Sequence, residues 1–77
     1  MTQILTRAPR LDSTTALGDT CDCCGVPAKL QVELAAGGEL TFCGHHANRL
    51  ARQIAVEAVH VVVEDGFEWR GLALYPS

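Results

Sequence analysis

Two pairs of metal-ligand residues, each with the same internal spacing, limit most strongly how this chain can fold. Cys21 and Cys24 are separated by two residues, as are Cys43 and His46, and eighteen residues lie between the two pairs. A structural zinc ion takes four such ligands in a tetrahedron, with sulfur at about 2.3 Å and imidazole nitrogen at about 2.0–2.1 Å. The spacing therefore predicts a single zinc ion (Zn2+) held by Cys21, Cys24, Cys43 and His46.

The first pair leaves a choice of ligand, because Cys23 stands beside Cys24. Cys24 is favoured, since a gap of two residues after Cys21 forms a tight knuckle and Gly25 lets the backbone fold under the metal. Cys23 then becomes an ordinary free thiol. A redox or second-metal role for Cys23 has little support, because nothing nearby except zinc would lower the pKa of its thiol. The sequence alone leaves Cys23 as an alternative ligand to Cys24.

The second pair leaves the same choice between His45 and His46. Residues three positions apart share one face of a helical turn, whereas residues two positions apart do not. A helix is expected to begin after Cys43, so Cys43 and His46 would point to the same side. His46 is therefore the favoured ligand, with His45 as the alternative.

Hydrophobic periodicity predicts a β-hairpin between the ligand pairs and a helix after them. Residues 29–34 and 39–42 alternate apolar with polar side chains, and Gly37-Gly38 suits the turn. From about residue 45 to 57 the apolar residues recur at helical spacing. Knuckle, hairpin and helix in this order predict a small α+β zinc-binding domain of the treble-clef or zinc-ribbon-like kind.

The two ends of the chain are less regular. Residues 1–19 show no sustained period and predict a flexible N-terminal tail, followed by a single zinc-stabilised domain over residues 20–77. The β-branched run 59–63 favours a strand, and Asp65-Gly66 favours a turn into residues 67–74, which together would form a second, C-terminal hairpin. Continuation of the helix to about residue 64 is the alternative.

The small size of the chain also leads us to expect a stabilising metal ion. With 77 residues there is room for one domain, and a core of that size rarely supplies more than about 3–5 kcal/mol of net stability. One tryptophan, one tyrosine and two phenylalanines are the only large aromatic packing units. Zinc contributes about 10–16 kcal/mol to small zinc peptides. The metal is therefore expected to supply most of the folding free energy.

The sequence also bears on the compartment. The chain has no hydrophobic signal core and no stretch near the roughly 20 apolar residues that cross a membrane. We therefore expect a cytoplasmic protein without membrane association. Thiols stay reduced in the cytoplasm, which favours metal ligation over disulfide formation.

We expect a non-enzymatic function, because four protein ligands leave no position on the metal for water or substrate. The H-x-E pattern of zinc deaminases is also missing. A small protein-interaction module is the favoured role, with host transcription or translation machinery as the partner class by analogy. Exposed strand edges would also permit a homodimer. The candidate partner contacts are Arg49, Arg52, Trp69 and Tyr75.

A nucleic-acid-binding zinc finger is the alternative function. Arg49 and Arg52 lie on the outer face of the expected helix, where they could meet phosphate groups. The net charge of the chain is −3, however, and proteins that bind nucleic acid through its phosphates usually carry the opposite sign. The charge therefore disfavours this alternative.

The two ligand clusters also carry a family resemblance. Residues 21–25 read C-D-C-C-G, which matches a C-D-x-C-G knuckle, and residues 37–46 read G-G-E-L-T-F-C-G-H-H, which matches G-G-E-L-x-F-C-x-H-H. The chain resembles a family of small, functionally uncharacterised zinc-ribbon-like proteins from actinobacteria and their phages, over roughly residues 11–57. The resemblance implies a cytosolic metal-binding protein and supplies no activity.

Overall fold

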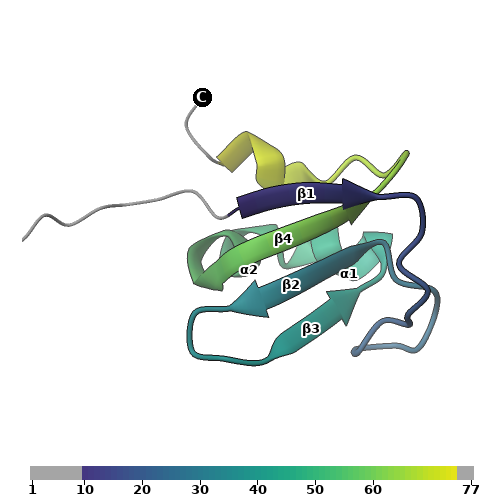
Figure 1. Ribbon diagram of the computed structural model, residues 1–77, viewed down its shortest axis with the longest axis horizontal. Helices are drawn as coiled ribbons and strands as arrows, with labels where there is room; N and C mark the ends of the chain where they lie inside the picture. The colour runs from purple at the N-terminus through teal and green to yellow at the C-terminus, as the bar shows by residue number, and fades with distance from the viewer. Residues whose placement is uncertain (1–9, 75–77) are drawn as a thin grey trace, which may run out of the picture.

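The computed structural model describes residues 10–74, which form one mixed sheet with a helical layer against one face (Figure 1). The strand order is β1-β4-β2-β3, with β1 parallel to β4 and the other neighbours antiparallel. The predicted α+β class is confirmed. The elements in chain order are β1 (Arg10–Thr14), β2 (Leu30–Leu34), β3 (Glu39–Phe42), α1 (Gly44–Arg49), α2 (Ala51–Glu57), β4 (Ala58–Glu64) and the 3₁₀ helix η1 (Arg70–Leu74).

The predicted hairpin and helix are both present. β2 and β3 pair antiparallel, and their turn contains Gly37 and Gly38 at φ values of 101° and 92°, which favour glycine. The helix is interrupted at Leu50, which has φ −99° and ψ 17°. Hydrogen bonds from Leu50 N–H to His46 O and from Ile54 N–H to Leu50 O continue through the interruption. The chain therefore carries the helical run from the metal ligands to β4 in two segments.

The N-terminal segment contains a strand where the sequence predicts a flexible tail. Arg10–Thr14 form β1, which runs parallel to β4 with Arg10 opposite His60. Nearly every β1 residue is exposed, so no hydrophobic alternation marks this strand in the sequence. Backbone pairing with β4 accounts for it instead. The remainder of the predicted tail that precedes β1, residues 1–9, lies outside the described residues.

The C-terminal hairpin is present only in its first half. β4 is the predicted strand, but its neighbours are β1 and β2, and residues 70–74 form η1 rather than a returning strand. The continued helix is also wrong, since the α2 C-cap residue Ala58 already has extended backbone. The Trp69 indole lies in the core, where Nε1 donates to Ala47 O at 2.8 Å. This contact directs the chain across the helices instead of along the sheet.

The core lies between the inner face of the sheet and the helical layer. Of the predicted valine run, Val61 is fully buried and Val59 is exposed. This difference in burial arises at a β-bulge in the β2–β4 pairing. Glu33 lies opposite His60 and Leu34 lies opposite Ala58, so Val59 has no partner on β2. The buried hydrophobic cluster consists of Cys21, Leu30, Val32, Phe42, Cys43, Ala47, Ala51, Ile54, Ala58, Val61 and Trp69.

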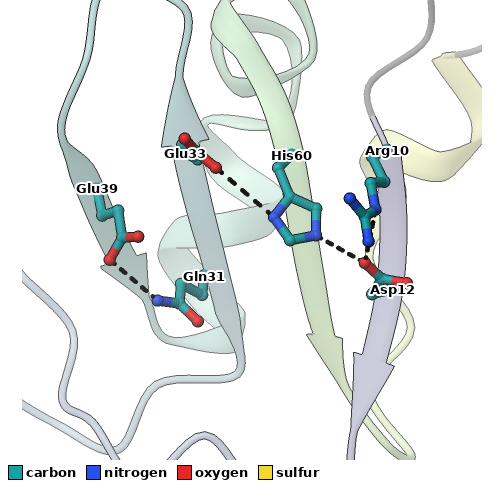
Figure 2. A network of polar contacts seen from close by, with 6 residues as sticks. All are labelled: Arg10, Asp12, Gln31, Glu33, Glu39 and His60. Atoms are coloured by element: carbon teal, nitrogen blue, oxygen red, sulfur yellow. Dashed lines mark hydrogen bonds and ion pairs between the residues drawn. The ribbon is translucent and has the colours of Figure 1, made fainter.

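The outer face of the sheet carries a polar network that connects three strands. Figure 2 shows the His60 ring on β4 between Asp12 on β1 and Glu33 on β2. His60 Nε2 lies 2.7 Å from Asp12 Oδ2, and Nδ1 lies 3.7 Å from Glu33 Oε1. The hydrogen bond to His60, together with the nearby charge of Arg10, holds the pKa of the Asp12 carboxyl below its usual value. The network thereby attaches the exposed strand β1 to the middle of the sheet.

Candidate metal centre

Cys21, Cys24, Cys43 and His46 come together at one end of the fold, with their ligand atoms all within 4.8 Å of one another. Cys24 Sγ lies 3.7 Å from Cys43 Sγ, and His46 Nδ1 lies 3.7 Å from Cys21 Sγ and 3.3 Å from Cys43 Sγ. Bonds of about 2.0–2.3 Å to a tetrahedral ion place neighbouring ligand atoms about 3.3–3.8 Å apart. These three distances therefore match those of a tetrahedral metal site.

The distance between the sulfur atoms also shows that the site is not a disulfide. A disulfide joins its sulfurs at about 2.05 Å, far shorter than the 3.7 Å between Cys24 and Cys43, and all four cysteines are free. Cys23 is exposed and lies outside the cluster. His45 is exposed as well, and its ring meets that of His46 edge-on. The structure thus brings Cys24 and His46, rather than their neighbours, to the site.

Short local structures position each ligand pair. In the knuckle, Gly25 N–H donates to Cys21 O at 2.8 Å, and Gly25 has a φ of 81° that favours glycine. In the second pair, Cys43 is the N-cap of α1, and its sulfur accepts from His46 N–H at 3.5 Å. The helical turn thus presents Cys43 and His46 on the same side, as their spacing predicts.

Asp22 attaches the knuckle to the edge of the sheet. Its N–H donates to Thr41 O, and its Oδ2 accepts from Thr41 N–H, each at 2.8 Å. Thr41 Oγ1 also donates to Thr20 O. Because β3 is an edge strand, these bonds occupy backbone groups of Thr41 that would otherwise face solvent. Asp22 is the positioning residue that spacing arguments missed; its sequence signals are its place between two ligands and the aspartate of the C-D-x-C-G motif.

The electrostatics of the sulfur cluster favour a bound cation. Burial acts to raise the pKa of the Cys21 thiol, but backbone hydrogen bonds from Cys43, Cys23 and Cys24 outweigh it and lower the pKa to about 6. A backbone hydrogen bond from Val26 acts to lower the pKa of Cys24, but desolvation and the sulfurs of Cys21 and Cys43 raise it overall. Thiolates this close oppose one another's ionisation, and a metal ion relieves that opposition.

The predicted partner contacts fall into different environments. Arg49 and Arg52 are exposed on the helical layer. Trp69 is only 3% exposed, so it belongs to the core and offers no surface to a partner. Tyr75 lies outside the described residues. Among residues 10–74 no helix has both the length and the apolar character needed to cross a membrane.

Comparison with known proteins identifies a family. A family model described as "Domain of unknown function (DUF7455)" matches residues 14–68. The matched segment contains the knuckle, the hairpin, both helices and β4, and therefore all four candidate ligands. No curated protein matches the chain, and no solved structure matches it.

Proposed function

The chain belongs to the family described as a domain of unknown function, DUF7455, and on that premise we propose that it is a structural zinc protein without enzymatic activity. The observation that carries the proposal is the donor set, three sulfurs and one imidazole nitrogen within 4.8 Å. Zinc accepts this set as a closed tetrahedron in structural sites, whereas catalytic sites keep one position for water or substrate. The ion then supplies folding free energy rather than chemistry.

The role that we propose for the zinc-held body is a small cytoplasmic protein-interaction module of the treble-clef-like kind. Knuckle, hairpin and helix follow one another in the order typical of that fold. The metal joins these parts at one end of the molecule, which leaves the outer side of the helical layer, with Arg49 and Arg52, accessible to a partner. By analogy with other small zinc modules, host transcription or translation machinery is the proposed partner class.

Nucleic-acid binding is the less supported role. The net charge of the chain is −3, and Asp12, Glu33, Glu39 and Glu64 all lie on strands of the sheet. The net negative charge repels a long phosphate backbone. A protein partner with a limited contact area avoids this repulsion.

Cobalt substitution tests whether the site is closed. We expect Co²⁺ to bind one per chain and to give the ligand-field and thiolate charge-transfer bands of a four-coordinate tetrahedral site. Excess azide should leave the spectrum unchanged, because no coordination position is open. Cys23→Ser is the matched control and should give the wild-type spectrum, whereas Cys24→Ser should alter it. A spectral shift on addition of azide would show an exchangeable position and contradict the non-enzymatic assignment.

A further inference from the structure

A recess on the helical layer is lined mainly by hydrogen-bond donors. Gly44, His45, Asn48 and Arg49 on α1 and Arg70 on η1 surround a hollow of about 360 Å³ beside the metal centre. Among the described residues, no acidic side chain lines this recess. Its side chains offer two guanidinium groups, an imidazole and a carboxamide, and guanidinium groups are well suited to oxyanions because their donors form a planar fork.

Two hydrogen bonds bring Arg70 beside Arg49, although 20 residues separate them in the chain. The buried Trp69 donates from Nε1 to Ala47 O at 2.8 Å, and Arg70 N–H donates to Asn48 Oδ1 at 2.7 Å. Core packing of Trp69 therefore fixes where the backbone of Arg70 lies. The second bond also uses the Asn48 oxygen, which leaves the Asn48 amino group as a further donor.

The arginines of the recess differ in their ion pairing from the cations near the sheet. Near the sheet, Arg10 pairs with Asp12 and Lys29 pairs with Glu64. Within residues 10–74, Arg49 and Arg70 take part in no ion pair. A chain of net charge −3 thus keeps unpaired positive charge at this recess, which is the electrostatic complement of an anionic ligand.

We propose that the recess binds an acidic segment of a partner protein, with a side-chain carboxylate held by Arg49 and Arg70. This inference rests on the proposed interaction role and names the chemistry of the partner. A hollow of about 360 Å³ is at the small end of binding pockets and suits one or two carboxylates. An acidic peptide is favoured over nucleic acid, because the net charge of −3 repels a long polyanion more strongly than a short acidic segment.

The test uses zinc-loaded, ¹⁵N-labelled full-length protein and a fluorescein-labelled peptide with four consecutive glutamates among glycines and serines. We expect the peptide to shift the backbone amide signals of His45, Arg49 and Arg70. Exchange of both recess arginines, Arg49→Gln with Arg70→Gln, should weaken binding roughly tenfold, because two charge-assisted hydrogen-bonding groups are lost. Arg10→Gln is the control: it removes one positive charge from β1, outside the recess, so binding should change less than about twofold.

Zinc content and circular dichroism, measured on the same samples, separate loss of the site from loss of the fold. The inference is overturned if folded, zinc-loaded wild-type protein does not bind the peptide, or if the Arg10 variant loses as much affinity as the double variant. It is also overturned if a single-stranded oligonucleotide of about a dozen nucleotides binds more tightly at the same salt concentration. None of these three outcomes bears on the structural zinc proposal. If folded, zinc-free protein bound the peptide at these amides, the zinc proposal would be overturned and the recess proposal would stand.

Discussion

Cys43→Ser is expected to leave the chain largely unfolded even in excess zinc. Cys43 lies 3.3 Å from His46 Nδ1 within the metal cluster, and its sulfur also caps α1 by accepting from His46 N–H. Zinc contributes about 10–16 kcal/mol in small zinc peptides, whereas a core of this size supplies about 3–5 kcal/mol. Loss of one ligand therefore removes more free energy than packing can replace. Far-UV circular dichroism and thermal melting should show no cooperative transition.

Cys23→Ser is the matched control for this experiment. Cys23 is exposed and lies outside the metal cluster, so its exchange should change the free energy of unfolding by less than about 0.5 kcal/mol. A Cys43→Ser variant that kept the wild-type spectrum and melting temperature would show that the fold does not depend on the metal.

The second large effect is expected at Gly71, where a methyl group has no room. An alanine Cβ at this position would lie 2.2 Å from Cζ2 and 2.4 Å from Cε2 of Trp69. The indole is 3% exposed and donates to Ala47 O, so it cannot move away without opening the core and breaking that bond. We expect Gly71→Ala to lower the free energy of unfolding by about 3 kcal/mol, near the upper end for overpacking. Urea denaturation of zinc-loaded protein measures this loss.

Gly44→Ala provides the comparison for this substitution. Its Cβ would lie 3.1 Å from Cε1 of Phe67, an aromatic ring that is only partly buried and therefore less constrained than the buried indole. The expected loss is less than about 1 kcal/mol. Equal effects of the two substitutions would mean that the packing of Trp69 against Gly71 does not determine the stability of the helical layer.

The features that could be predicted from sequence are those that depend on near neighbours. The knuckle, the hairpin and the first helical turn each follow from spacing or alternation within a few residues, and they place Cys21 and His46 as predicted. Buried positions on β2 follow from the same alternation, with Leu30 and Val32 fully buried. Local patterns thus sufficed for the metal cluster.

The features that could not be predicted depend on distant partners. β1 buries almost nothing, and it exists because its backbone pairs with β4 about fifty residues later. Residues 70–74 turn away from the sheet because Trp69 finds its hydrogen-bond partner at Ala47. Asp22 lies in the knuckle and acts through Thr41 on β3. No periodicity near these residues encodes such contacts, so only the assembled structure shows them.

Native mass spectrometry of protein purified without added metal, before and after treatment with a strong chelator, tests the central claim most directly. We predict one zinc ion per chain in the untreated protein. Removal of the ion should unfold the chain and move its charge states to those of an extended polypeptide. A folded, metal-free chain, lighter by two hydrogens for each cysteine pair, would instead contain disulfides, and the structural zinc assignment would then be wrong.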